Sequence, residues 1–416
     1  MNMEEKAYRP TRYACFLTSF STAATGNLSP LLFLTFRNFY HLSYSMLGLL
    51  VAVNFGTQLL FDLLFTVYSS RLPLKKCVKI MPAVMGAGFV LYGLAPWLMP
   101  GREFLCLTMG TVIFSIGNGL SEVLTSPTVA ALPDKNPDRL MARLHSCYAW
   151  GVVAVVFIVT LFLKLFGAEN WPVLAFLFAL PPLCATLLFL FSPIPDIEGN
   201  REDKPNLGIF KNKTLWLCCI CIFLGGAAEC TMSQWCSGYV EQALGLDKVW
   251  GDVFGLALFG GVLGLGRSLY AHRGKTISGI LIWGSAGAAV CYLMAVFSPN
   301  AVLSLIACAL TGFCVSMLWP GSLIRTAELV PQGGVSMYAF MAAGGDLGAA
   351  LVPQLVGILS DGVLASPGLL SVAETLSLTA DSFALRCGMA AGALFPIAGI
   401  FCFIRLKKKK SPGDAG

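Results

Sequence analysis

The sequence predicts an all-α integral membrane protein with twelve membrane-spanning helices in two similar halves of six. Only 12% of its 416 residues are charged and 56% are hydrophobic, whereas soluble domains have roughly 25% and 45–50%. Apolar stretches recur along the chain at the length of about 20 residues that a helix needs to cross a bilayer. The longest polar stretch lies near the middle. This composition excludes a disordered chain, a soluble enzyme and a nucleic-acid-binding protein.

The individual spans follow from the apolar stretches, which are continuous and therefore unlike the alternating strands of a membrane β-barrel. We expect spanning helices at 12–36, 44–68, 76–99, 104–131, 144–166, 171–192, 214–241, 248–270, 276–298, 301–328, 333–360 and 382–405. The expected domains are an N-terminal six-helix bundle over 1–192, a cytoplasmic central loop over 193–213, and a C-terminal six-helix bundle over 214–416 with a basic tail.

The basic residues predict the orientation of the chain. If the N-terminus is cytoplasmic, 23 of the 28 Lys and Arg residues, Arg267 and Lys407–Lys410 among them, fall in cytoplasmic segments. Cytoplasmic loops of membrane proteins carry such an excess, so we expect a protein of the cell membrane with both termini in the cytoplasm. The 15 Cys residues show no metal-ligand spacing, and we expect no metal and no cofactor.

The two halves repeat each other weakly. Ala23-Ala24 matches Ala227-Ala228, and Ser29 matches Ser233, at a constant offset of 204 residues. Matches that keep their order at a fixed offset indicate an internal duplication.

The most specific motifs lie in the fourth and fifth spans. They read Gly117-Asn-Gly-Leu-Ser-Glu122-Val-Leu-Thr-Ser-Pro127 and Ser146-Cys-Tyr148-Ala-Trp-Gly151. With these motifs the sequence resembles the major facilitator superfamily over essentially its whole length, and within it the fucose-permease-like branch of sugar/proton symporters. The resemblance implies the major facilitator fold of two pseudo-symmetric six-helix bundles, and a proton-coupling role for Glu122. The aspartate that this branch carries in span one corresponds to Pro30 here, and its span-five amide positions correspond to His145 and Tyr148. Neither the fucose specificity nor the full coupling scheme therefore carries over.

Acidic residues inside the spans are the best candidates for coupling transport to protons, since each needs a polar lining or a partner in the membrane. We expect Glu122 and Glu229 to be proton-coupling groups, with His145 as a third candidate because imidazole titrates near neutral pH. The alternative for each is a packing role between helices. For Asp62, near the end of span two, we expect a structural ion pair.

Several amide, hydroxyl, carboxyl and aromatic side chains in the spans could hydrogen-bond to or stack on a sugar ring. The expected substrate-binding residues are Asn27, Asn118, Tyr148, Ser233, Gln234, Trp235, Trp319 and Asp346. A contact between helices is the alternative for each, and Trp is also common at membrane interfaces.

We therefore expect a secondary active transporter, not an enzyme, that moves a small polar organic solute such as a sugar by proton-coupled alternating access. Its partners would be the solute, protons and the lipid bilayer, with no nucleic acid, and we expect a monomer. No phosphate-binding loop of the type G-x-x-x-x-G-K-[ST] is present. Two alternatives stay open, namely proton-driven efflux of amphipathic compounds and a membrane sensor that transports nothing.

Overall fold

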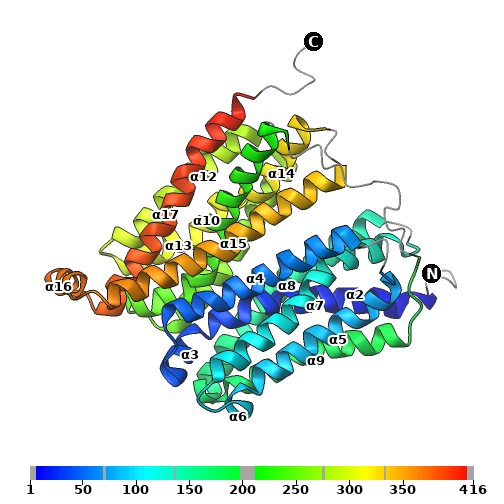
Figure 1. Ribbon diagram of the computed structural model, residues 1–416, viewed down its shortest axis with the longest axis horizontal. Helices are drawn as coiled ribbons and strands as arrows, with labels where there is room; N and C mark the ends of the chain where they lie inside the picture. Colours follow the sequence, from blue (N-terminus) through cyan, green and yellow to red (C-terminus); the bar gives the residue numbers. More distant parts are fainter. Residues whose placement is uncertain are drawn as a thin grey trace. The chain divides into compact units, whose positions relative to one another are not determined.

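The structure is a computed structural model that describes residues 6–68, 72–134, 137–196, 211–273, 277–331 and 334–409. These residues form helices joined by turns (Figure 1). They divide by contacts into two compact units, of which unit 1 is Met1–Leu42 with Val53–Glu202 and unit 2 is Ser43–Ala52 with Asp203–Gly416. Each unit is described by itself below.

The elements of the first half of the chain are α2 (Arg9–Leu31), α3 (Phe33–Tyr40), α4 (Tyr44–Tyr68), α5 (Leu74–Gly93), α6 (Ala95–Leu98), α7 (Glu103–Ala130), α8 (Pro137–Phe166), η2 (Ala168–Asn170) and α9 (Trp171–Leu190). Those of the second half are α10 (Lys213–Leu244), η4 (Trp250–Ala257), α11 (Leu258–Arg273), α12 (Ile277–Phe297), α13 (Ala301–Val315), α14 (Leu318–Leu329), α15 (Gly334–Leu364), α16 (Pro367–Thr375) and α17 (Ala380–Lys407).

All twelve expected spans coincide with helices over most of their length. Within the described residues, ten helical segments are long and apolar enough to cross a membrane. The other two expected spans correspond to α2, which is rich in Ser and Thr, and to α5, which begins with three lysines in its first turns. Helices with such polar residues must pack against other helices in a bilayer, because lipid tails offer polar groups no hydrogen-bond partners.

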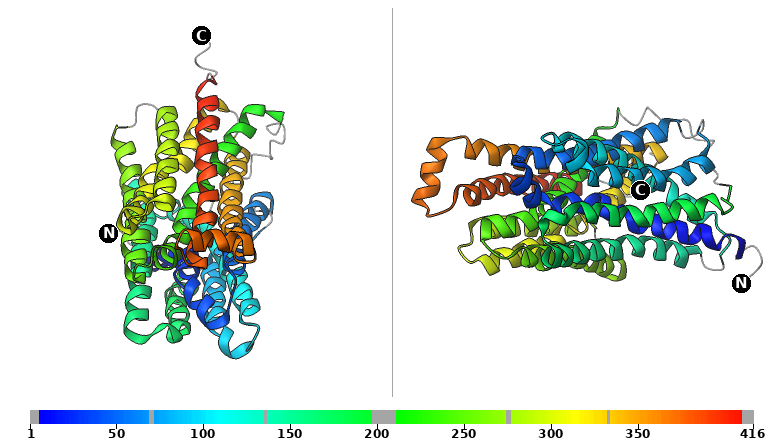
Figure 2. Two further views of the ribbon diagram at one scale, coloured as in Figure 1. Left: turned by 90° about the vertical axis from the view of Figure 1, so that its left-hand side faces the viewer. Right: turned by 90° about the horizontal axis from the view of Figure 1, so that it is seen from below.

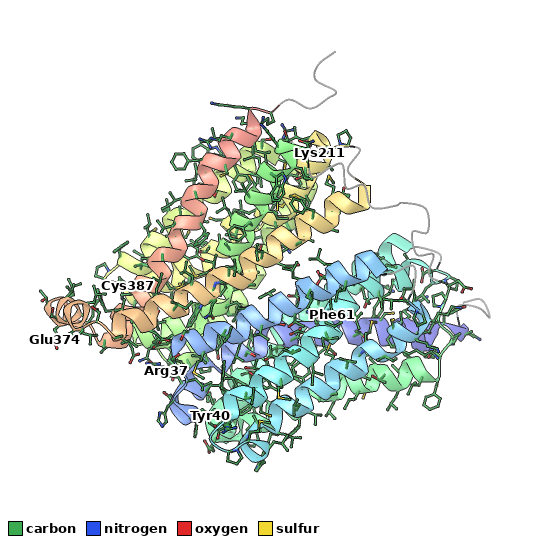
Figure 3. The ribbon with its side chains drawn as sticks, viewed as in Figure 1. Arg37, Tyr40, Phe61, Lys211, Glu374 and Cys387 are labelled. Carbon is green, nitrogen blue, oxygen red and sulfur yellow. The ribbon has the colours of Figure 1, made fainter. Side chains whose placement is uncertain are left out.

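Unit 1 depends on a glycine seam where α5 packs on α7. A methyl group at Gly88 would lie 2.2 Å from the backbone nitrogen of Phe114, and one at Gly110 would lie 2.8 Å from the Cα atom of Tyr92. Small residues at such crossings let backbones approach closely, which is how helices gain packing energy in lipid. The indole N–H of Trp171 donates to the hydroxyl of Tyr40 at 3.0 Å; Tyr40 is labelled in Figure 3.

Unit 2 is built around α10, which packs against α13, α14, α15, α17 and η4. Tyrosine hydroxyls fasten it to α12, since Tyr239 donates to the carbonyl of Ala295 and Tyr292 donates to that of Ala228, both at 2.8 Å. Both rings are fully buried. The helix at the centre of this unit is therefore fixed along much of its length.

The first turns of α4 also belong to unit 2, where they lie against α15. The Asp361 carboxylate accepts the backbone N–H groups of Tyr44 at 2.9 Å and Ser45 at 2.7 Å. It thereby caps the N-terminus of α4, whose first N–H groups lack partners within the helix. Gly357 makes the approach possible, because a methyl there would lie 2.3 Å from the Tyr44 carbonyl oxygen.

A wide π-helical turn, η4, precedes α11 and carries a buried ion pair. Asp252 is fully buried and accepts from Lys248 Nζ at 2.9 Å and from the hydroxyl of Ser237. The lysine side chain is 22% exposed. This network attaches η4 to α10 and keeps a carboxylate inside the protein without leaving its charge unpaired.

Two features of unit 2 differ from the expected spans. The expected span 301–328 consists of two helices, α13 and α14, with a break at Ser316 and Met317. The segment between the last two spans contains an additional helix, α16, where a loop was expected. Figures 1 and 2 show α16 at the end of the α15 and α17 pair, and its residue Glu374 is labelled in Figure 3. Nearly all its side chains are exposed, Ala373 excepted.

Candidate functional site

Glu122 lies in α7 on the polar face of that helix. Ser115, Asn118 and Thr125 share this face within two helical turns and are buried, whereas Glu122 is exposed. The opposite face carries Met109, which is 42% exposed, as expected of a side that meets lipid. Glu122 therefore opens on the polar side of unit 1, and it makes no hydrogen bond or ion pair with any described residue. Such a carboxylate would cost about 2.5–3.5 kcal/mol at mid-helix in hydrocarbon.

A hydrogen-bond network next to this face was not identified from the sequence. Asn54 of α4 donates to the carbonyl of Thr25 at 3.1 Å, and its amide oxygen accepts from Gln58 at 2.8 Å and from Ser115 at 2.7 Å. Its members are buried. The sequence feature that could have revealed this network is the pair of amide side chains, Asn54 and Gln58, one turn apart in an apolar span. Because Asn54 Oδ1 and Nδ2 are both used, the network stabilises the contacts among α2, α4 and α7.

The other expected site residues of unit 1 lie apart from this network. Asn27 is buried and its amide donates to the carbonyl of Ala23 in the preceding turn at 2.8 Å. Asn118 is buried one turn from Glu122. Tyr148 on α8 is 46% exposed, and the side chain of His145 lies outside the described residues. Their proposed contacts with a solute or a proton stay predictions.

In unit 2, Glu229 pairs with an arginine that the sequence analysis assigned to a cytoplasmic segment. Arg267 Nη2 lies 3.3 Å from Glu229 Oε1 and 3.4 Å from Oε2. Glu229 is in the middle of α10, and Arg267 is in α11 inside the candidate span Trp250–Tyr270. Arg267 lies within the expected span 248–270, and α11 continues past it to Arg273 and brings its guanidinium to an acid of the same unit.

The break between α13 and α14 supplies the second partner of Arg267. Its Nε atom donates to the carbonyl of Ser316 at 3.0 Å. That carbonyl would receive the N–H of the residue four positions later in a regular helix, but this residue is Pro320, which has no N–H. A proline thus frees the oxygen that holds the arginine in place.

Trp319 and Asp346 lie beside this ion pair. A methyl group at Gly226 of α10 would be 2.9 Å from the Trp319 ring, and one at Gly345 of α15 would be 2.5 Å from it. The ring is therefore in contact with both helices, next to Asp346 and one turn from Glu229. Unit 2 thus gathers two acids, one guanidinium and an indole in one place.

The remaining expected residues of unit 2 lie further along α10. Ser233 donates to the carbonyl of Cys230 in the preceding turn at 3.2 Å, and Gln234 is buried. Trp235 is 1% exposed, and its indole N–H donates to the carbonyl of Pro353 at 2.9 Å. This arrangement connects α10 to α15 and presents no surface of Trp235 to a solute in this conformation. Among the described residues no group of three or more His, Cys, Asp or Glu could hold a metal ion.

Comparison with known proteins identifies the family. The family model of the Major Facilitator Superfamily matches residues 14–353. The chain belongs to this superfamily. Its fold is accordingly the all-α major facilitator fold of two six-helix bundles, and it is a multi-pass membrane protein of a family of transporters.

Individual relatives are more distant. The membrane protein MosC of Rhizobium meliloti is 25% identical over 336 residues, which are 79% of this chain and 78% of MosC. A bacterial homologue of the human lysosomal transporter Spinster, in an inward-facing and occupied conformation, has a TM-score of 0.78 at 14% identity and covers 99% of this chain and 98% of its own. The Escherichia coli fucose:proton symporter FucP has a TM-score of 0.58 at 16% identity, with 97% and 100% covered. The two structures show similarity of fold.

Proposed function

We propose that this protein is a secondary active transporter that moves a small polar organic solute, such as a sugar or a related metabolite, together with protons. Membership of the Major Facilitator Superfamily supports transport by alternating access, in which the two bundles expose a shared route to each side of the membrane in turn. The similarity of fold to a fucose:proton symporter supports a sugar-like solute and proton coupling.

The observation that carries the coupling proposal is the position of Glu122. It is an exposed carboxyl on the polar face of a spanning helix, with no partner among the described residues. An ionised side chain within a spanning helix costs free energy, so charged residues there usually face a water-filled cavity and have a function. Reversible protonation is such a function for Glu122. Glu229, which is paired with Arg267, is the second candidate for proton coupling. His145 is the third proton-coupling candidate of the sequence.

The test is uptake by the purified protein in proteoliposomes under an imposed proton gradient, with radiolabelled L-fucose and D-xylose as probes. We expect concentrative uptake that Glu122→Gln abolishes while exchange of solute down its own gradient persists. Glu103→Gln is the matched control, because Glu103 is in the first turn of the same helix and accepts from the backbone N–H of Gly101. Full concentrative uptake by Glu122→Gln would refute the role of this residue.

We also propose that both termini are cytoplasmic and that the protein works as a monomer in the cell membrane. The distribution of Lys and Arg supports this orientation. Tags at the two ends should both be protected from a membrane-impermeant reagent in intact cells and labelled after permeabilisation. Ends on opposite faces would contradict the proposal.

A further inference from the structure

Among the described residues three ion pairs contain an arginine, and two of them are shorter than the third. In the short ones, Arg12 lies 2.8 Å from Asp134 and Arg325 lies 2.7 Å from Glu328, with arginine side chains 18% and 12% exposed. The Arg267 pair is longer, at 3.3 Å, and the arginine side chain is 44% exposed. Charge-assisted hydrogen bonds in stable pairs measure about 2.7–2.9 Å. The Arg267 pair is therefore the loosest and most accessible of the three, although it lies inside a candidate span.

The guanidinium of Arg267 is held in position by hydrogen bonds that involve only some of its N–H donors. Nε is bound to the Ser316 carbonyl and Nη2 reaches Glu229, while Nη1 makes no hydrogen bond within the described part of the chain. A guanidinium offers five N–H donors in a planar fork that matches a carboxylate. An anchored arginine with an unused edge is suited to receive such a group from outside the protein.

We propose that the transported solute carries a carboxylate, and that Arg267 binds this group when a proton on Glu229 releases the guanidinium. The inference rests on the proposed transport function and names the class of solute: a sugar acid, such as a hexuronate. The indole of Trp319, which is partly exposed, provides a face for the sugar ring. Among the described residues at this place Arg267 supplies the positive charge, which fits a solute with a single negative charge.

The coupling follows from competition for one guanidinium. When Glu229 is ionised, its carboxylate occupies Nη2 and neutralises the arginine; when Glu229 takes up a proton from water, the guanidinium is free for the carboxylate of the solute. Proton and anion would therefore bind together, and anion binding should strengthen as the pH falls. Glu229 contacts Arg267 of α11, and Asp346 of α15 directly follows Gly345, which packs on the Trp319 ring.

Other charged side chains on the elements packed against α10 have partners elsewhere. Arg325 binds Glu328 and the carbonyl of Lys409. Asp252 binds Lys248, and Arg386 donates to the carbonyl of Val296. Asp361 and Asp381 accept from Tyr44. Within the described residues, the charges that act at this site are thus those of Glu229, Arg267 and Asp346.

The experiment measures ligand-induced thermal stabilisation of the purified full-length protein in detergent, with each variant compared with its own unliganded melting temperature. The probes are D-glucuronate and D-galacturonate, with D-glucose and D-galactose as neutral partners, at pH 5.5 and 7.5. A ligand that binds only the folded state raises the free energy of unfolding by RT ln(1 + [L]/Kd), so a tighter ligand at the same concentration raises the melting temperature more. We expect a hexuronate to bind at least tenfold more tightly than its neutral partner, and more tightly at the lower pH.

Three variants separate a binding site from a structural ion pair. Arg267→Gln should remove the response to the acids, and Arg267→Lys should weaken it at least tenfold, because lysine keeps the charge without the planar fork. Glu229→Gln imitates the protonated acid, and should bind the hexuronate at pH 7.5 as tightly as the unmodified protein does at pH 5.5. Arg325→Gln is the matched control, an arginine of the same unit that should keep the full response whatever its own stability.

The possible outcomes distinguish failure of the carboxylate site from failure of the proposed transport function on which it rests. Equal shifts by acids and neutral sugars, no shift by either acid, or loss of the response in Glu229→Gln would overturn the inference. If the unmodified protein takes up L-fucose or D-xylose in proteoliposomes but neither hexuronate raises its melting temperature, the proposed function stands and the carboxylate site is refuted. If the unmodified protein takes up neither the neutral sugars nor radiolabelled D-glucuronate and D-galacturonate, the proposed function itself fails.

Discussion

Substitution of Lys248 by methionine should destabilise the protein strongly, because it removes one partner of a buried ion pair. Asp252 is fully buried, and without the lysine it retains the hydroxyl of Ser237 as a donor. Breaking a buried pair from one side costs about 3–5 kcal/mol, since an uncompensated charge is left behind. The remaining hydrogen bond and the 22% exposure of the lysine side chain place the expected loss near the lower end, about 3 kcal/mol.

The measurement is equilibrium unfolding of the full-length protein in mixed micelles by sodium dodecyl sulfate, followed by tryptophan fluorescence. The double variant Lys248→Met/Asp252→Asn removes both charges and keeps an acceptor for Ser237. It should therefore regain all but about 1 kcal/mol, the usual net contribution of one hydrogen bond. Lys164→Met, at an exposed position at the end of α8, is the control and should change stability by less than about 0.5 kcal/mol.

Two results would refute this reasoning. If Lys248→Met is as stable as the unmodified protein, the carboxylate of Asp252 does not depend on the lysine. If the double variant is no more stable than the single one, the loss comes from packing of the lysine stem and not from an unpaired charge.

The same unfolding titration tests three further changes. Gly88→Ala should cost about 1–3 kcal/mol by overpacking the α5–α7 crossing, whereas Gly26→Ala, with no atom within 4 Å of the added methyl, should be neutral or stabilising by up to about 1 kcal/mol; equal effects would show that the glycine seam is not tight. Trp235→Phe should lose about 1–3 kcal/mol by depriving a buried carbonyl of its donor, and an unchanged midpoint would contradict the importance of that bond. Asp361→Asn replaces one of the two acceptor oxygens at the start of α4 by an NH₂ group, which cannot accept from a backbone N–H, and should lower the free energy of unfolding by about 1 kcal/mol. A gain in stability would show that Asp361 does not cap the helix.

The spans and the acidic residues within them could be predicted from the sequence. A bilayer requires long apolar helices, so length and composition are enough to place them. Glu122 stands out for the same reason, because a carboxyl in an apolar segment is rare and its neighbours Asn118 and Thr125 give one helical face a polar character. The motif around Glu122 also pointed to the family that the comparison then showed.

Side-chain partners inside the membrane were not predictable to the same extent. Trp235 looked suited to a sugar ring, but the fold buries it and uses its N–H to fasten α15. The extra helix α16 was missed because its exposed side chains give no span signal. The first turns of α4 group with the second half of the chain, where Asp361 caps them from more than 300 positions away.

The sequence by itself determined that this is a membrane protein with a dozen apolar helices and a few immersed acids, because hydrocarbon imposes those features on any chain that crosses it. Only the tertiary structure decided that Arg267, near the end of the expected span 248–270, pairs with Glu229. Spanning helices are apolar on most sides, so the periodicity of a helix does not reveal which face meets another helix and which meets lipid. The pairing of Glu229 with Arg267, and the carbonyl that Pro320 leaves free, arise when α10, α11 and the α13–α14 break pack together.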